Sequence, residues 1–139
     1  MALESSNSRF NKKELALSLG RFGEDIACKY LVDKGYKIID RNFRQKWGEL
    51  DIIAKAPDKT LVFVEVKTLQ QAQARQAEDS LQPEDQLTKS KLQKLKRTAS
   101  LYAGHNSKLI KDDKGWQIDL LALTIDGENC DIRHYENVN

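Results

Sequence analysis

The stretch LVFVEVKTL, residues 61–69, begins as an apolar strand and ends with a carboxylate and an ammonium group two residues apart. Side chains alternate between the two faces of a strand, so Phe63, Glu65 and Lys67 share one face. Two interpretations of this spacing are open. The pair is an ordinary solvated strand end with a salt bridge, or it belongs to a site in which the carboxylate binds a cation and the amine contacts an anion.

A second acid lies within reach of Glu65 if the chain folds back as a hairpin. Residues 49–54, ELDIIA, predict a strand, and residues 55–60, KAPDKT, are typical of a turn. With the turn centred near Asp58, opposed side chains lie roughly 4.5–5.5 Å apart at Cβ, whereas a slip of one residue would separate them. The predicted pairs are Asp51 with Glu65, Ile53 with Phe63, and Glu49 with Lys67.

Two carboxylates at that distance on a partly buried face repel each other and lose hydration, so the pair needs a positive charge between them. Mg²⁺ or Mn²⁺ takes oxygen ligands of this kind. We therefore predict that Asp51 and Glu65 bind a divalent cation, together with the backbone carbonyl of Val66. Lys67 would orient a water or stabilise charge on a phosphate, as in a metal-dependent phosphodiester hydrolase. Glu49 is expected to pair with Lys67, and metal ligation is its alternative.

A helix predicted over residues 12–34, ending before Gly35, supplies one more acid. Glu24 lies in or beside the stripe that should pack on the rest of the protein, where it would complete the cluster through a water or a second metal. Gly20 and Gly23 destabilise a helix but permit close approach of another backbone. The stripe, at three- and four-residue steps, consists of Leu17, Gly20, Glu24, Ala27 and Leu31.

The length of 139 residues predicts a single domain, residues 1–139, and the helices and strands expected in it place it in the α/β class. Residues 1–11 are expected to be a flexible tail, and residues 68–87, rich in Gln, Ala and acids, a mobile loop. The predicted strands are 36–40, 49–54, 61–67 and 116–124, with an edge strand at 130–136 and a second helix at 88–103. Residues 41–48 are predicted to be a basic, aromatic connection.

Composition narrows the class of protein. A hydrophobic content of 40% and a charged content of 32% are typical of a soluble globular protein. No apolar run approaches the roughly 20 residues of a membrane span, and the N-terminus lacks the apolar core of a secretory signal, so we expect a cytoplasmic protein. Cys28 and Cys130 are expected to be free thiols. His105 and His134 are isolated and receive no catalytic or metal role, and Asp119 is expected to form structural hydrogen bonds.

The net charge is only +2, but basic residues gather in one part of the chain. Residues 89–111 contain seven Lys or Arg and no acid. Contact with nucleic acid and a solvated helix face are both compatible with this pattern. Phe43 and Trp47, among basic residues, would stack on bases or pack in the core. The predicted DNA contacts are Arg41, Arg44, Lys46, Lys89, Lys91 and Lys94.

Three stretches together resemble a known family. LGRFGEDIACKYLVDKGYKIIDRNFR, WGELDIIA and LVFVEVKT are similar to the bacterial YraN-like family, within the PD-(D/E)xK nuclease superfamily. The family is similar to archaeal Holliday-junction resolvases. The resemblance runs from about Leu19 to Ala103, with a weaker similarity in QIDLLAL and IRHYEN.

This resemblance implies a restriction-endonuclease-like fold, with a central mixed β-sheet of αβββαβ core plus a C-terminal edge strand, flanked by helices. It implies a Mg²⁺- or Mn²⁺-dependent DNA endonuclease that acts as a homodimer. Where the superfamily has Pro-Asp, this chain has Leu50 before the acid, and Leu69 stands where an Arg is expected. The matching catalytic positions are Glu24, Asp51, Glu65 and Lys67, and the three acids are the implied metal ligands.

Three classes of function are therefore compatible with the sequence. The first is a metal-dependent DNA endonuclease, selective for branched or repair-related DNA. The second is a DNA-binding module that keeps the nuclease fold without catalysis, which Leu69 and the modest net charge favour. The third is an interaction or scaffold protein that uses a sheet edge. Salt-dependent DNA binding separates the first two from the third, and cleavage separates the first from the second.

Overall fold

The computed structural model describes residues 12–70 and 87–139, with side chains from residue 20 onward. The predicted tail at 1–11, the side chain of Leu17, and residues 71–86 of the predicted loop lie outside the described part. The elements are α1 (Lys12–Asp33), β1 (Lys37–Gln45), β2 (Gly48–Lys55), β3 (Leu61–Gln70), α3 (Lys89–His105), η2 (Ser107–Leu109), β4 (Trp116–Asp126) and β5 (Asn129–Tyr135).

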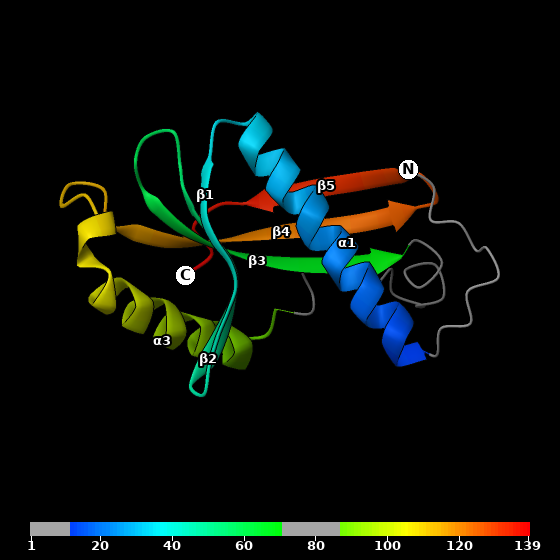
Figure 1. Cartoon of the computed structure of the whole chain (residues 1–139), viewed down its shortest axis with the longest axis horizontal. Helices are drawn as coiled ribbons and strands as arrows, with labels where there is room; N and C mark the ends of the chain where they lie inside the picture. Colours follow the sequence, from blue (N-terminus) through cyan, green and yellow to red (C-terminus); the bar gives the residue numbers. More distant parts are fainter. Residues whose placement is uncertain (1–11, 71–86) are drawn as a thin grey trace.

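The five strands form one mixed sheet in the order β1-β2-β3-β4-β5 (Figure 1). β3 and β4 run parallel, and the other neighbouring pairs are antiparallel. β3 and β4 are the strands whose sequences are nearly continuous apolar runs, because both of their faces are covered. The α/β class and the mixed sheet flanked by helices are confirmed, and the architecture is consistent with a restriction-endonuclease-like fold.

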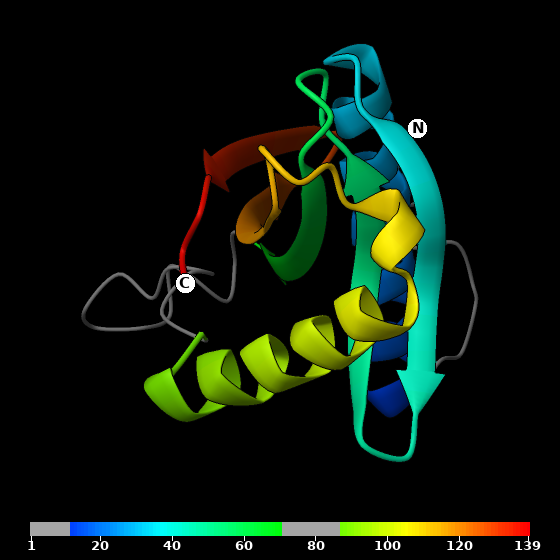
Figure 2. The same ribbon diagram turned by 90° about the vertical axis from the view of Figure 1, so that its left-hand side faces the viewer.

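The two helices cover opposite faces of the sheet (Figure 2). The core under α1 includes Ala27, Leu31, Ile52, Val64 and Leu121. The core under α3 includes Phe63, Leu95, Ala99, Tyr102 and Ile118. Val64 and Phe63 thus point to different helices, as the alternation of a strand requires. Glu65 continues the face of Phe63 and is therefore directed toward α3.

Two predicted boundaries were wrong. β1 runs from Lys37 to Gln45, so most of the stretch predicted to be a connection is strand, with a register shift between Ile38 and Asp40. β3 continues to Gln70, three residues beyond its predicted end, because its pairing with β4 extends to Gln70 opposite Ile125. The predicted loop therefore does not include residues 68–70.

Two further expectations, one about the cysteines and one about membrane-spanning helices, concern residues that the structure describes. Cys28 and Cys130 both carry free thiols, as predicted. Neither of the helices in residues 12–70 and 87–139 combines the length and the apolar character needed to cross a lipid bilayer.

Candidate active site

The predicted acids lie where β2 and β3 separate. The two strands pair from Lys55–Leu61 to Ile52–Val64, and Ile53 lies opposite Phe63 as predicted. Beyond that point β2 continues with β1 down to the hairpin tip, whereas β3 continues along β4 (Figure 1). The backbone pairing therefore ends one residue before the predicted pair of acids. We call this position the fork.

Asp51 replaces the missing backbone partner at the fork. Its Oδ2 accepts a hydrogen bond from the backbone N–H of Val66 at 2.9 Å. A buried backbone N–H that lost its strand partner would otherwise be unsatisfied. The carboxylate of Asp51 is thus held against β3, next to Glu65.

Glu65, Asp51 and Lys67 form one connected group. The side chains of Glu65 and Lys67 are only 17% and 21% exposed, and Lys67 Nζ lies 3.4 Å from Glu65 Oε2. Burial raises the pKa of Glu65 to about 8, aided by a hydrogen bond with the Asp51 carboxylate and by its charge, while Lys67 acts in the opposite direction. The raised pKa favours the protonated form of Glu65, which can donate a hydrogen bond to Asp51. The side chains of the two predicted acids thus meet at the fork through a hydrogen bond.

Glu24 approaches the fork from α1. Gly23 makes this possible, because a Cβ at that position would overlap the hydroxyl of Thr68 on β3. Gly20 has no described atom within 4 Å of such a Cβ, so the close approach predicted for both glycines occurs at Gly23 alone among the described contacts. Burial, and then the charge of Asp51, raise the pKa of Glu24.

The structure does not gather all three acids into one compact group. Oxygen atoms of Glu24, Asp51 and Glu65 do not all lie within 4.8 Å of one another. Glu24 is close enough for the charge of Asp51 to act on it, with Arg41 and Arg44 lowering its pKa in opposition. Glu24 is therefore a neighbour of the acid pair and not a member of it. From the sequence, we expected Glu24 to complete the cluster through a water or a second metal.

Ion pairs on the surface correct one predicted partner. Glu49 lies 3.3 Å from Arg44, not beside Lys67, and its side chain is 64% exposed. Beyond the fork β2 pairs with β1, so the partner of Glu49 comes from β1. Arg41 is likewise paired, at 2.7 Å, with Asp25. Two of the six predicted DNA contacts thus already have an acidic partner, although exposed pairs of this kind are weak.

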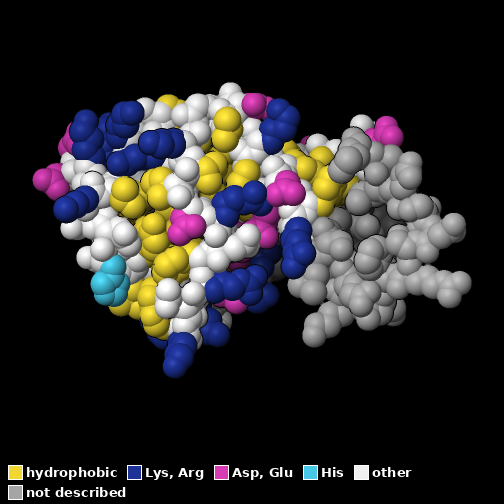
Figure 3. Space-filling model, in the orientation of Figure 1, with side chains coloured by type: hydrophobic (Ala, Val, Ile, Leu, Met, Phe, Trp, Pro, Cys, Tyr) yellow, Lys and Arg dark blue, Asp and Glu magenta, His cyan; other side chains and the backbone are white. Residues whose placement is uncertain are grey.

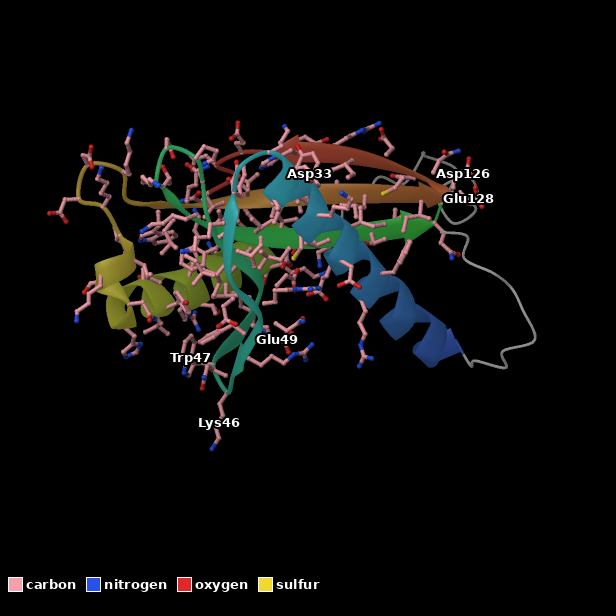
Figure 4. All side chains as sticks on the ribbon, turned by 45° about the horizontal axis from the view of Figure 1, so that its top comes forward. Asp33, Lys46, Trp47, Glu49, Asp126 and Glu128 are labelled. Carbon is pink, nitrogen blue, oxygen red and sulfur yellow. The ribbon has the colours of Figure 1, made fainter. Side chains whose placement is uncertain are left out.

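The predicted lysines come from α3 and from the tip of the β1–β2 hairpin. Lys89, Lys91 and Lys94 are exposed on the first half of α3, and Lys46 lies at the hairpin tip. Figure 4 shows Lys46, Trp47 and Glu49 together at this tip, with the Lys46 side chain extending away from the fold. A cavity of about 450 Å³ lies between the tip and α3, and its lining includes Lys46, Trp47, Glu65, Lys91, Lys94 and Thr98.

Comparison with known proteins identifies the family. The model of the uncharacterised protein family UPF0102 matches residues 23–123. The chain is 37% identical to a UPF0102 protein of Fervidobacterium nodosum over 135 residues, covering 96% of this chain and 88% of that protein. It is 34% identical to one of Syntrophomonas wolfei over 119 residues, covering 86% and 95%. The chain belongs to the UPF0102 family.

UPF0102 is the YraN family, so the resemblance found in the sequence is confirmed. The names of these relatives give the family and no activity. A UPF0102 protein of Campylobacter jejuni, 38% identical over 120 residues, covers 86% of this chain and 92% of its own length. The chain is thus similar to its relatives over nearly their whole length.

A second cluster of ionisable side chains lies on the α1 side of this UPF0102 protein. Asp119, His134 and Glu136 offer ligand atoms that all lie within 4.8 Å of one another, so they could hold a metal ion. The fully buried Asp119 accepts hydrogen bonds from Gln117 Nε2 at 2.8 Å, His134 Nε2 at 2.7 Å and the backbone N–H of Asn137 at 2.9 Å. The hydrogen-bonding role predicted for Asp119 is confirmed.

His134 is not isolated, which corrects the prediction. Its Nε2 donates to Asp119 at 2.7 Å, and in the neutral ring its Nδ1 then accepts from the hydroxyl of Tyr30 at 3.2 Å. This chain of hydrogen bonds connects α1, β5 and β4. The apolar strand around Asp119 was the only signal in the sequence, since the pairing that places His134 opposite Leu121 on β4 was not predicted.

Asn42 was missed by sequence reasoning. It has a φ of 52°, a left-handed conformation that Asn adopts more readily than most residues. With its amide nitrogen turned toward Glu24, it donates hydrogen bonds of 2.7 and 3.3 Å to the two carboxylate oxygens. Its position in the basic stretch RNFR of β1 gave no indication of this contact, which depends on how α1 packs on the sheet.

Proposed function

We propose that this UPF0102 protein is a metal-dependent deoxyribonuclease whose reaction centre is formed by Asp51, Glu65 and Lys67. The observation that carries the proposal is the buried acid pair at the fork, in which the carboxyl groups of Asp51 and Glu65 contact each other and the Lys67 ammonium group lies 3.4 Å from Glu65. Perturbed carboxylates that meet a charged partner at a partly open position are typical of catalytic sites.

The donor set fits a hard divalent cation. Asp51 and Glu65 contribute carboxylate oxygens from two different strands, and burial makes their mutual repulsion strong. A cation with two positive charges removes that repulsion more completely than the single shared proton does. Mg²⁺ or Mn²⁺ therefore competes with the proton for the same place.

Each residue has a separate role. When bound, the divalent cation would neutralise phosphodiester oxyanions and activate a water for attack at phosphorus. Asp51 and Glu65 would hold the cation, and Lys67 would stabilise charge that develops on the phosphate. Glu24, which is fixed by Asn42, would orient water beside the acid pair. The attacking water forms a new P–O bond while one ester P–O bond breaks, which leaves a phosphomonoester and a free hydroxyl.

DNA is the proposed substrate because basic side chains flank the acid pair. Lys91 and Lys94 line the same cavity as Glu65, and their charge would attract a phosphate backbone. The resemblance to Holliday-junction resolvases favours branched or repair-related DNA. The homodimer and the cytoplasmic location stay predictions.

A cleavage panel tests the proposal. End-labelled linear, flapped and four-way-junction DNAs are incubated with the protein in EDTA, Mg²⁺ or Mn²⁺. We expect metal-dependent nicking that falls on the order of 10³-fold in Glu65→Gln, because the cation contributes several kcal/mol. Asp33→Asn is the matched control, since Asp33 is an exposed acid that is paired with Lys29 and does not line this cavity. The nuclease proposal fails if neither metal gives cleavage of any of these DNAs.

A non-catalytic DNA-binding protein is the second candidate. It is favoured by the separation of Glu24 from the acid pair, which leaves only two acids in direct contact. In that case Mn²⁺ would bind, and DNA would bind with a steep salt dependence, but no DNA would be cut. The panel above separates the two candidates directly.

A further inference from the structure

The cavity beside Glu65 is a defined groove with two walls. One wall is the β1–β2 hairpin tip with Trp47, the other is α3 with Lys91 and Lys94, and Glu65 lies between them. The walls are held together where Gly48 meets α3, because a Cβ at Gly48 would overlap the hydroxyl of Thr98. The position of Trp47 relative to α3 is therefore fixed by packing.

Trp47 is exposed and supported from behind. It is 40% exposed, and its ring lies 5.8 Å from the ring of Phe43. Phe43 in turn packs edge-on against Tyr102 at 5.0 Å, and Tyr102 packs against Phe63 of the core at 5.6 Å. An aromatic ring that is already held in place loses little conformational freedom when a ligand stacks on it.

Two lysines of α3 line the wall of the groove opposite Trp47. Lys91 and Lys94 are three residues apart on α3, so their Cβ atoms lie about 5–6 Å apart on one face. Neither forms an ion pair with an acid in residues 20–70 or 87–139. The first turn of α3 contains no acid, which leaves the positive end of its dipole uncompensated within the helix. This wall suits consecutive phosphates of one strand.

We propose that this groove binds an unpaired nucleotide, with its base stacked on Trp47 and its phosphates at Lys91 and Lys94. The inference rests on the proposed function and specifies its substrate class. The DNA that reaches Glu65 is single-stranded, or contains a flap or gap, and is not continuous duplex.

Three arguments favour an unpaired strand over a duplex. A base presents a free face to an aromatic ring only after it leaves its stack, because neighbouring base pairs cover both faces in a duplex. A cavity of about 450 Å³ has the size of a small-molecule pocket and admits a nucleotide. On the face shown in Figure 3, Lys and Arg side chains lie in several groups with apolar and acidic side chains between the groups.

Binding without metal tests this inference apart from cleavage. Fluorescence anisotropy in EDTA compares a labelled oligothymidylate of about 12 nucleotides, within the known range of single-strand site sizes, with a blunt duplex of about 12 base pairs. We expect Trp47→Leu to weaken single-strand binding about 10-fold, and Trp47→Phe to change it less than about 2-fold, with duplex binding unchanged in both. Leu keeps the apolar bulk but lacks the aromatic face.

The lysines have a matched control on the same helix. Lys91→Ala and Lys94→Ala should each reduce the slope of log affinity against log salt by about 0.7. Lys96→Ala, exposed on α3 but outside the groove, should leave the slope unchanged. Quenching of tryptophan fluorescence by oligothymidylate, absent in Trp47→Phe, gives a readout that does not depend on the folding of the Leu variant.

Three results would overturn the inference. They are a preference of the wild-type protein for duplex, an equal affinity of wild type and Trp47→Leu for the single strand, and the absence of binding to either DNA. Cleavage with no dependence on Trp47 would refute the groove and leave the nuclease proposal standing. Single-strand binding through Trp47 without cleavage would support the groove and refute the nuclease proposal.

Discussion

Replacing Glu65 by glutamine should make the metal-free protein more stable at alkaline pH. The pKa of Glu65 is raised from 4.5 to about 8, chiefly by burial and then by its hydrogen bond with Asp51. The native state therefore holds a proton that the unfolded chain releases at a much lower pH. A glutamine amide can donate the same hydrogen bond to Asp51 and is neutral at every pH.

The sign and size of the effect follow from the two pKa values of Glu65. Below pH 4.5 both states are protonated, and the full contribution of this residue to stability is present. As the pH rises toward about 8, only the native state keeps the proton, and each pH unit removes about 1.4 kcal/mol of stability. Between about pH 5.5 and pH 8, the wild type should lose about 3 kcal/mol relative to Glu65→Gln.

Urea unfolding in EDTA at both pH values measures this loss. All other titrating groups are common to the two proteins, so the difference between them isolates Glu65. Glu49→Gln is the control, because this acid is 64% exposed and bound to Arg44, and its replacement should leave the pH dependence unchanged. If wild type and Glu65→Gln differ by less than about 0.5 kcal/mol between the two pH values, Glu65 ionises normally and the shared proton does not exist.

Three further predictions concern the metal and the packing. Mn²⁺ should raise the melting temperature of the wild type more near pH 8 than near pH 6, because it displaces the proton of Glu65, and Glu65→Gln should abolish the increase in a thermal shift assay. Gly23→Ala should cost about 1–3 kcal/mol in urea unfolding by overlap with β3, whereas Gly20→Ala, with no described atom in the way, should gain up to about 1 kcal/mol. His134→Ala should destabilise by about 1–3 kcal/mol, because the buried Asp119 loses a donor, and unchanged unfolding would show that this hydrogen bond is dispensable.

The register of the hairpin could be predicted, but its end could not. Alternation in both strands and a strong turn signal sufficed to place Ile53 opposite Phe63. The fork depends on β1, which draws β2 away from β3, and β1 itself was recognised only in part because its exposed residues lack an apolar alternation. The wrong partner for Glu49 has the same cause, since the prediction assumed that the pairing continued.

The sequence predicted that α1 contributes Glu24 to the site, but it did not predict how far Glu24 lies from the acid pair. The helical stripe put Glu24 on the packed face, and a glycine next to it indicated a close approach, which Gly23 makes against Thr68. How far Glu24 then lies from the acid pair depends on the tilt of α1 on the sheet, and no local pattern encodes that tilt. Asn42, which fixes Glu24, escaped prediction for the same reason.

The fork explains how the protein tolerates a pair of acids that weakens its fold. Apolar residues at positions 51 and 65 would remove the loss of stability that burial of Glu65 causes above pH 4.5. The separation of β2 from β3 instead leaves Glu65 lining a groove, and Asp51 satisfies the backbone N–H that the separation frees. The acid pair thus lowers stability, although its hydrogen bonds are satisfied and one side of it is open. This combination is expected of a site that binds a charged ligand. A cation bound at the fork would make the acid pair stabilise the native state. Mn²⁺ should therefore raise the stability of the native state in proportion to the repulsion between the two carboxylates that it relieves.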